Sequence, residues 1–201
     1  YVENIDINKP HLTIKSENGS ANCVVRAANP NDHVFYVTAD NVTIKGFTVT
    51  GAGYYKAGIH LYNSDYCRIE NISASNNYRD GIYLYKSSNN TIANNTVSSN
   101  SWYGIRLNYS SNNIITNNIV SNNLCGICLD YSNNNTIANN TVSNNWDGIS
   151  LWSSSNNTIA DNTVSSNNYD GICLGHSSNN TIVNNTVLNN EDGIEPGYSS
   201  N

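Results

Sequence analysis

The sequence has no methionine, only three prolines and few charged residues, which make up 12% of its 201 residues. Only nine residues are lysine or arginine and the formal net charge is −6, so the basic patch that a nucleic-acid partner requires is missing. No apolar run approaches the roughly 20 residues of a membrane-spanning helix, and no signal-peptide pattern opens the chain. We therefore expect neither a nucleic-acid partner nor a membrane span in this chain.

Both ends of the chain read as the interior of a longer sequence. The first residues, YVENIDINKP, resemble the middle of a strand-rich domain, and the last, GIEPGYSSN, stop within a repeat. We interpret residues 1–201 as a single domain and as a fragment of a longer polypeptide.

Asparagine and serine are the dominant residues of a phrase that recurs along the sequence. The stretch SSNNTIANNTVSSN, residues 87–100, holds five asparagines and four serines, a composition that by itself favours disorder. Closely similar phrases return at 132–145, 154–167 and 177–190. Such recurrence is typical of a repeat architecture in which each unit buries its apolar face against the next.

The dipeptide Gly-Ile sets the period of this repeat. It begins at residues 58, 81, 104, 126, 148, 171 and 193, so the spacing is always 22 or 23 residues. Alignment on this dipeptide gives four apolar columns, which start at Ile59, Leu61, Ile69 and Ala74, and Pro196 breaks the leucine column. Each repeat thus has three short strand-like patches, and none is long enough for a helix.

These columns predict an all-β fold, a right-handed, single-stranded parallel β-helix with one rung per 22–23 residues and about eight or nine rungs. Successive turns would stack at the strand spacing of roughly 4.8 Å. Residues 51–201 form the regular repeats. Residues 1–50 are less regular, with earlier strands near Ile5, Leu12 and Val24 and one degenerate rung at 33–50.

The asparagines form columns of their own. Three of these begin at Asn89, Asn90 and Asn95, and a fourth runs Asn77–Asn100–Asn122–Asn144–Asn167–Asn189. At a corner, asparagine tolerates the left-handed backbone conformation, and identical side chains one rung apart can hydrogen-bond along the axis. Because Asn95 and Val97 are two residues apart, we expect the Asn95 column to face inward.

The phrase Gly-Ile-x-Leu…Ser-Asn-Asn-Thr-Ile…Asn-Asn-Thr-Val resembles the parallel β-helix repeat of the pectin-lyase-like superfamily, most nearly the group that includes the accessory β-helix protein of nitrous oxide reductase. The phrases ENIDINKPHLTI and ADNVTIKGFTVT resemble the start of such domains in cell-surface proteins of methanogenic archaea. The resemblance spans essentially the whole chain and implies the fold and an extracellular or cell-surface location. For function it leaves open polysaccharide lyases, hydrolases and epimerases, carbohydrate-associated surface modules and metal-site accessory proteins.

Residues that alternate with the inward Ile and Leu face outward and vary in type. They suit a glycan, because flat rings stack on sugar faces and polar neighbours bind hydroxyls. The resemblance implies the same, since this face carries the polysaccharide groove in the enzymes of the superfamily. Ordinary exposed aromatic residues on a sheet are the alternative. The candidate ligand-binding residues are Tyr62, Tyr83, Tyr85, Arg106, Asp130, Trp146 and Trp152.

Aspartate precedes Gly-Ile in four repeats, at positions 80, 147, 170 and 192. We interpret Asp-Gly as a turn in which glycine supplies a positive φ and water screens the carboxylates. Alternatively, Asp147, Asp170 and Asp192 could bind Ca²⁺, the one cofactor considered, or supply acid and base for glycoside cleavage, with His176 as a further catalytic candidate. The paired-aspartate and Gly-His-Gly phrases of the hydrolase family are not found in the sequence, nor is the Arg and Lys constellation of the lyases.

The five cysteines do not pair on adjacent rungs. Cys128 and Cys173 share a column but lie two rungs, or roughly 10 Å, apart, which is beyond disulfide reach. Cys125-Gly-Ile-Cys128 is a CxxC pattern that lacks the second pair or following histidine of a zinc or haem site. We therefore expect free thiols, with a soft-metal site at Cys125, Cys128 and Cys173 as a minor alternative.

Taken as a whole, the pattern predicts a non-catalytic extracellular or envelope module that presents one face to a polysaccharide, a cell-surface glycan or a protein partner. An open stack of rungs also exposes backbone edges, which favours end-to-end or lateral self-association. The alternatives are a polysaccharide-active enzyme and an accessory protein for a metal site.

Overall fold

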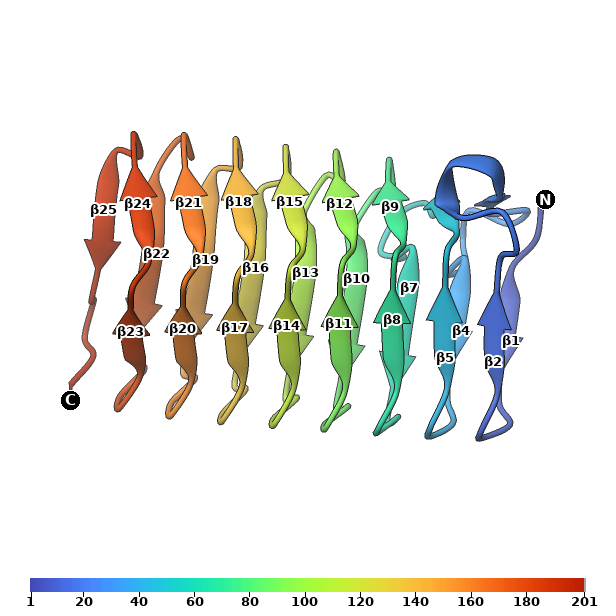
Figure 1. The fold of residues 1–201 in the computed structure, drawn as a ribbon, viewed down its shortest axis with the longest axis horizontal. Coiled ribbons are helices and arrows are strands. Elements are labelled where there is room, and N and C mark those ends of the chain that lie inside the picture. The colour runs from blue at the N-terminus through green and yellow to red at the C-terminus, as the bar shows by residue number, and fades with distance from the viewer. Residues whose placement is uncertain (201) are drawn as a thin grey trace.

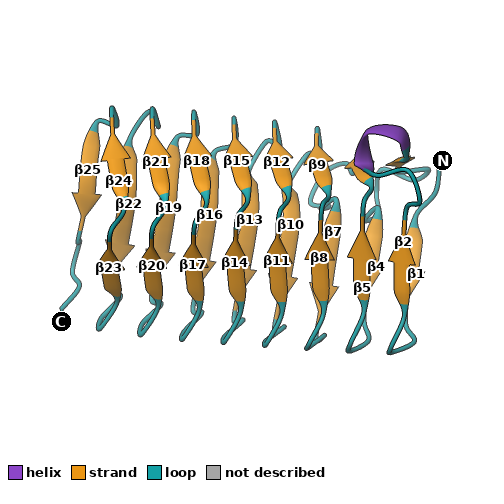
Figure 2. Cartoon of the chain, viewed as in Figure 1, coloured by secondary structure: helices purple, strands orange, loops and turns teal. Residues whose placement is uncertain are grey.

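The chain winds into a parallel β-helix with three sheets, described over residues 1–200 of a computed structural model (Figure 1). Every turn contributes one strand to each sheet, and all strand pairs are parallel and one turn apart. Strands therefore form all three sides of the coil, and corners of a few residues join them (Figure 2). Within the described residues no helix is long or apolar enough to cross a membrane.

Sheet 1 has nine strands and carries the variable face. It comprises β1 (Ile5–Ile7), β4 (Phe35–Val37), β7 (Ile59–Tyr62), β10 (Asp80–Tyr85), β13 (Tyr103–Asn108), β16 (Cys125–Asp130), β19 (Asp147–Trp152), β22 (Asp170–Gly175) and β25 (Asp192–Glu195).

Sheets 2 and 3 have eight strands each, all of three residues. Sheet 2 comprises β2 (Thr13–Lys15), β5 (Thr43–Lys45), β8 (Arg68–Glu70), β11 (Thr91–Ala93), β14 (Ile114–Thr116), β17 (Thr136–Ala138), β20 (Thr158–Ala160) and β23 (Thr181–Val183). Sheet 3 comprises β3 (Val24–Arg26), β6 (Thr48–Thr50), β9 (Ser73–Ser75), β12 (Thr96–Ser98), β15 (Ile119–Ser121), β18 (Thr141–Ser143), β21 (Thr163–Ser165) and β24 (Thr186–Leu188).

The predicted fold class is confirmed, and the regular part of the coil has about seven turns. These are the turns that begin at β7 and end at β25; the expected eight or nine rungs include the irregular turns of β1 and β4. The irregularity at the N-terminus has a local cause, because a 3₁₀ turn, η1 (Ser20–Asn22), interrupts the path between β2 and β3.

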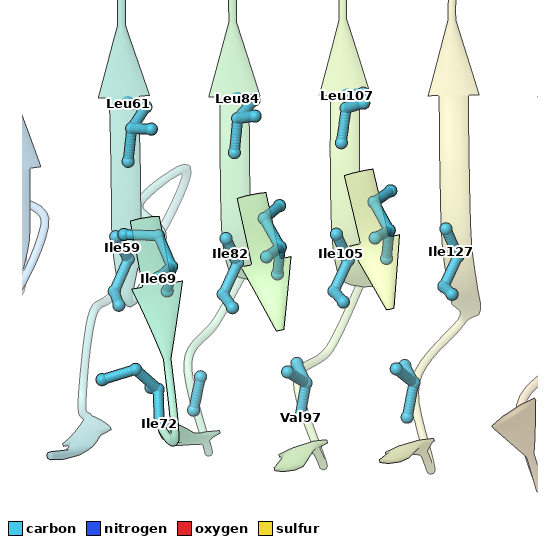
Figure 3. Close-up of a cluster of buried hydrophobic side chains, with 14 of the residues drawn as sticks. Ile59, Leu61, Ile69, Ile72, Ile82, Leu84, Val97, Ile105, Leu107 and Ile127 are labelled. Carbon is cyan, nitrogen blue, oxygen red and sulfur yellow. The ribbon is translucent and has the colours of Figure 1, made fainter. Parts of the chain in front are cut away.

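The interior is a dry column of aliphatic side chains, as the sequence columns predict. Ile82, Leu84, Ile92 and Val97 of one turn are fully buried, and the equivalent residues of the next turn lie directly over them (Figure 3). Burying one such side chain contributes about 1.5–3 kcal/mol, so the stack supplies the driving force for folding despite the polar composition.

Buried asparagines form three ladders along the axis. In each ladder the backbone N–H of one asparagine donates to Oδ1 of the next turn's asparagine, as from Asn95 to Asn118 at 2.9 Å. Asn95 Nδ2 also donates to the carbonyl of Ile69. The ladders therefore satisfy backbone groups that the strands leave at each corner. The inward direction expected for the Asn95 column is confirmed, since Asn95 is 1% exposed.

One predicted asparagine column is out of register in part. The buried ladder that starts at Asn77 and Asn100 continues through Asn123, Asn145, Asn167 and Asn190. The predicted members Asn122, Asn144 and Asn189 precede the ladder by one residue and have φ of 56–58°, the left-handed conformation of a corner. The prediction was wrong there because the Asn-Asn pairs allow either residue to be placed in the ladder.

In every Gly-Ile repeat except the last, close packing requires the glycine, which corrects the predicted positive φ. None of the glycines at 58, 81, 104, 126, 148, 171 and 193 has a positive φ. A Cβ on Gly148 would instead lie 2.5 Å from Val164 Cγ1 and within contact distance of the carbonyl of Gly171. Glycine thus lets the strand of sheet 1 approach the valine column of sheet 3.

Candidate functional site

On the outer face of sheet 1, the residues that project outward have an unusual spacing in the sequence. Gly126 and Ile127 both turn toward the interior, since Ile127 is fully buried and a Cβ on Gly126 would meet buried Val142. The residues on either side, Cys125 and Cys128, therefore project from the same outer face although they are three apart. The ladder reflects this, because Gly126 has no register partner between those of Cys125 and Ile127.

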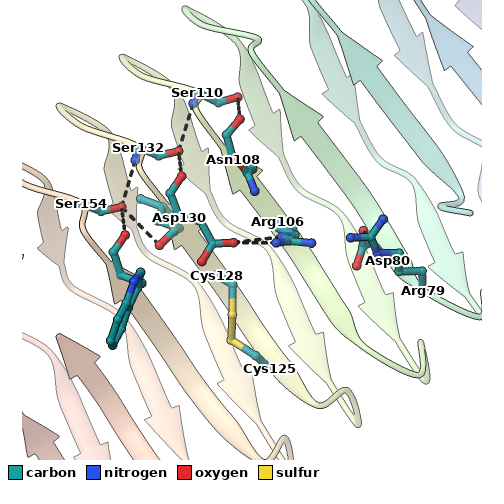
Figure 4. A network of polar contacts seen from close by, with 12 residues as sticks. Arg79, Asp80, Arg106, Asn108, Ser110, Cys125, Cys128, Asp130, Ser132 and Ser154 are labelled. Atoms are coloured by element: carbon teal, nitrogen blue, oxygen red, sulfur yellow. Dashed lines mark hydrogen bonds and ion pairs between the residues drawn. A yellow bond between two sulfur atoms is a disulfide. The ribbon is translucent and has the colours of Figure 1, made fainter. Parts of the chain in front are cut away.

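This spacing produces a disulfide between Cys125 and Cys128, which corrects the expectation of free thiols at these two positions (Figure 4). Their Cα atoms are 6.4 Å apart, within bonding range. The prediction considered only pairs on adjacent rungs and overlooked a pair on one strand. Cys23, Cys67 and Cys173 are free. Burial raises the pKa of the Cys67 and Cys173 thiols to about 11 and about 12, so both stay protonated. The soft-metal trio is thereby excluded, because two of its members are bonded to each other.

Aromatic rings run along the face from turn to turn. His60 stacks on Tyr83 at 4.6 Å, and Tyr62 stacks on Tyr85 at 5.7 Å. Farther along, Tyr109 stacks on Tyr131, Trp146 on Tyr169, and Trp152 lies edge-on to His176. Trp146 and Trp152 are about half exposed. These rings thus form short rows parallel to the axis, on the strands, in the loop before them and at the corner after them.

Arg106 is held rigidly in the middle of the face. Its Nε and Nη2 both donate to Asp130 Oδ2, at 3.0 and 2.8 Å, from the neighbouring turn (Figure 4). Its guanidinium also lies 4.8 Å from the ring of Tyr103 and 5.4 Å from that of Tyr83. The ion pair and the two rings fix the side chain. Burial lowers the pKa of Arg106, but Asp130, together with Asp80 and Tyr83, raises it above its usual value.

Asp80 lies beside this arginine and is fully buried, which corrects the picture of water-screened Asp-Gly turns. Its carboxylate has no hydrogen-bond partner and is 3.7 Å from Arg79 Nε. Burial raises the pKa of Asp80 to about 7, despite the opposing effect of Arg79 and Arg106. Asp80 belongs to strand β10 rather than to a turn, because the Gly-Ile bend follows it.

Unpartnered buried polar atoms concentrate on this face. In the part of the chain that the structure describes, seven buried side-chain nitrogen and oxygen atoms lack a hydrogen-bond partner, and all belong to sheet 1 or the loop that enters it. They are His60 Nε2, Arg79 Nε, both carboxylate oxygens of Asp80, Asn108 Oδ1, Asp147 Oδ1 and Asp170 Oδ1. Such atoms are uncommon in folded proteins, so their confinement to one face calls for water or a ligand there.

A pocket of about 340 Å³ opens on the same face. Its lining brings together three predicted residues, Asp130, Trp146 and Asp147, with the disulfide. Tyr103, Leu124 and Ser150 complete the lining. Of the other predicted ligand-binding residues, Tyr62 and Tyr85 stack together, Tyr83 and Arg106 lie side by side, and Trp152 faces His176.

The acidic candidates lie at equivalent positions of the last three turns. Asp170 and Asp192 are register partners, and Asp147 begins the preceding strand of sheet 1. Within residues 1–200 no group of three or more His, Cys, Asp or Glu side chains is arranged to hold a metal ion. His176 has a positive φ after β22 and lies against Trp152 and Tyr198, so it packs with rings rather than with the acids.

Sequence reasoning missed three residues of the site and one structural feature. Asp80, Arg79 and His60 were not among the candidates, and neither was the pairing of residues three apart. A signal was present, because every repeat carries two consecutive inward residues, Gly and Ile, which brings the residue before Gly and the residue after Ile onto one face.

Solved structures share this architecture. The periplasmic alginate epimerase AlgG superposes with a TM-score of 0.73 at 20% identity, over 88% of this chain and 49% of that one. A pectate lyase superposes with a TM-score of 0.70 at 18% identity, over 90% of this chain and 57% of that one. A DFA-IIIase from Arthrobacter chlorophenolicus superposes with a TM-score of 0.74 at 16% identity, over 92% of this chain and 54% of that one. This chain thus spans about half the length of these structures, and identities this low establish the fold alone.

No curated protein matches the sequence. The family model of the right-handed β-helix region matches residues 2–130 and 57–201, which together span nearly the whole chain. The chain therefore belongs to the right-handed β-helix family.

Proposed function

We propose that the outer face of sheet 1 binds a glycan and that the protein is a non-catalytic extracellular or cell-surface module. The observation that carries this proposal is the confinement of all unpartnered buried side-chain nitrogen and oxygen atoms of the described chain to sheet 1 and the loop that enters it. Sugar hydroxyls both donate and accept hydrogen bonds, so a glycan can satisfy the orphaned donors of His60 and Arg79 and the orphaned acceptors of Asp147 and Asp170.

The aromatic rings of this face support the same ligand. Rings recur at the spacing of the turns, and the exposed faces of Tyr62, Trp146 and Trp152 provide flat apolar surface for sugar rings. Several matched structures are named for saccharides, among them alginate and pectate. A polysaccharide lying along the axis of the β-helix would contact one turn after another.

An extracellular location is supported by the disulfide. Disulfides persist in oxidising compartments and are rare in a reducing cytosol. The alginate epimerase among the matched structures is described as periplasmic.

The geometry favours binding over catalysis. The carboxyl group whose pKa is nearest neutrality, that of Asp80, has no exposed surface through which to reach a glycosidic bond. The carboxyl groups of the last turns lie beside other acids, and the guanidinium of Arg106 is engaged by Asp130.

Affinity electrophoresis through a panel of soluble polysaccharides tests the proposal. The wild-type chain is expected to be retarded by at least one polysaccharide, and Trp152→Ala and Tyr85→Ala each to weaken retention by about tenfold, because each removes one stacking surface. The matched control is Tyr66→Asn, which removes an exposed tyrosine at a corner where φ is +58° and asparagine is well tolerated. Absence of retardation on every polysaccharide, or equal losses for Tyr66→Asn, would refute the proposal.

A further inference from the structure

Charge is distributed unevenly along the axis. All nine lysines and arginines lie at or before Arg106, whereas seven of the fifteen acidic residues follow it. Six of these seven lie on sheet 1 or the loop that enters it: Asp130, Asp147, Asp170, Glu191, Asp192 and Glu195. Only Asp130 has an ion-pair partner among the described residues, so the C-terminal half of the face is acidic without compensation.

Two of these acids are built into the surface. Asp170 is 4% exposed and its Oδ1 has no partner, and Asp147 Oδ1 is likewise buried and unpartnered beside the pocket. Burial raises the pKa of both, a hydrogen bond to the backbone of Asp170 or to the thiol of Cys173 lowers it in part, and neighbouring acids raise it. A buried carboxylate oxygen without a partner indicates that one is supplied from outside.

Aromatic rings alternate with these acids. Trp146 precedes Asp147 and Tyr169 precedes Asp170, and the two rings stack at 6.2 Å with an interplanar angle of 20°. The backbone N–H of Tyr169 donates to the carbonyl of Trp146 at 2.8 Å, which fixes their relative positions. Rings beside carboxylates are the arrangement that attracts an ammonium group, through the ring face and the negative charge together.

The N-terminal half of the face shows the same arrangement with its cation present. There the guanidinium of Arg79 lies 5.5 Å from the ring of Tyr83, and Arg106 lies between Tyr83 and Tyr103 and is paired with Asp130. In the C-terminal half the rings and carboxylates recur, but the protein provides no lysine or arginine. The missing component is a cation.

We propose that the C-terminal half of the face, from Trp146 to Glu195, binds the ammonium groups of a cationic glycan, an oligomer of amino sugars whose amines are free. This inference rests on the proposed function and specifies its ligand. Amines spaced along the oligomer would meet acids on successive turns, while the sugar rings lie on Trp146 and Tyr169.

Calorimetric titration of the full chain with three oligosaccharides tests this inference. The probes are a glucosamine hexamer, its N-acetylated counterpart and a galacturonate hexamer, which are respectively cationic, neutral and anionic. The glucosamine hexamer is expected to bind at least about tenfold more tightly than the other two. Tighter binding of either of the others would overturn the inference and leave the proposed function standing, whereas no binding by any probe and no retention on the polysaccharide panel would refute both.

Variants separate a saccharide site from a general attraction of cations. Asp170→Asn and Trp146→Ala are each expected to weaken glucosamine-hexamer binding by about tenfold, and Asp161→Asn, which removes an exposed acid outside sheet 1, to leave it unchanged. Hexalysine is the control ligand. If hexalysine binds as tightly as the glucosamine hexamer, or if Trp146→Ala has no effect, the inference is wrong, because charge alone would account for binding. Circular dichroism confirms that each variant retains the wild-type fold.

Discussion

Two sets of polar side chains repeat along this molecule, and they differ in how completely they are satisfied. The asparagine ladders at the corners are buried, yet each amide has partners on the turns before and after it. The outer face of sheet 1 also carries polar side chains, but it leaves buried donors and acceptors unpaired. The comparison indicates that the ladders contribute stability, whereas the unpaired groups of the face cost stability, as is usual for polar groups kept available in a binding site such as the one proposed.

Breaking a ladder should have the largest effect on stability. Asn118 Oδ1 accepts from the backbone N–H and the amide of Asn95, and its Nδ2 donates to the carbonyl of Ile92 and to Asn140. Asn118→Leu leaves several of these groups buried and unpaired, at about 1–3 kcal/mol each, so we expect the free energy of unfolding to fall by about 5 kcal/mol. Urea denaturation followed by far-UV circular dichroism measures this.

Asn117 provides the matched control. It is exposed, adopts a φ of 55° and makes no side-chain hydrogen bond, so Asn117→Gly should change the free energy of unfolding by less than about 0.5 kcal/mol. Similar losses for Asn117→Gly and Asn118→Leu would mean that the ladder does not carry the stability assigned to it.

Removing the buried charge of Asp80 should change the free energy of unfolding by an intermediate amount. The change should be an increase, opposite in sign to the loss expected from breaking a ladder. The pKa of Asp80 is about 7 in the folded chain and close to 3.8 in the unfolded chain, so between about pH 4 and pH 7 the folded state binds more protons. The contribution of Asp80 to stability is therefore present at low pH and is lost as the pH rises, by up to about 4 kcal/mol. Asp80→Asn should consequently be more stable than wild type at pH 8.

The difference between wild type and Asp80→Asn at each pH isolates this residue. Burial lowers the pKa of His33 to about 4 and that of His60 to about 2, so these histidines favour folding at higher pH and oppose the slope due to Asp80. Urea denaturation between about pH 4 and pH 8 should give a difference that grows with pH. A difference independent of pH would show that the Asp80 carboxyl does not titrate in this range.

The disulfide should have the smallest effect. It closes a loop with a sequence separation of only three, so the loss of chain entropy it imposes on the unfolded state is worth about 2 kcal/mol. The double substitution Cys125→Ser and Cys128→Ser should destabilise by that amount and make stability insensitive to reductant. Cys173→Ser is the control, and a reductant effect that persists in the double variant would show that another pair is involved.

The repeat made the interior predictable from sequence. Ile82, Leu84, Ile92 and Val97 recur at a fixed spacing and alternate with polar residues, so their columns, the strands and the axis follow from the period. The buried serine ladder was missed although it was equally regular. The backbone N–H of Ser87 donates to Ser110 Oγ at 3.0 Å, and that of Ser110 to Ser132 Oγ. Serine next to asparagine in a polar corner gives no hint of burial, because its small side chain is usual at exposed turns.

The face was less predictable because its residues do not repeat. The sequence identified Trp146, Asp147 and Asp130 as candidates, and the structure places them around one pocket. The burial of Asp80 and the disulfide depend on the bend at Gly-Ile, which a strictly alternating strand does not contain. Contacts between neighbouring turns, such as that of Arg106 with Asp130, could be predicted only if the pairing of the two strands were known without an error of even one residue.

The variation between 22 and 23 residues per turn falls between the ladder asparagine and the next glycine, a corner with no strand of its own. Because every turn touches only its two neighbours, gene duplication could insert or delete a complete turn at such corners without disturbing the rest of the coil. Each event would lengthen or shorten the outer face by about 4.8 Å, so this architecture allows the length of the proposed binding face to change in uniform steps.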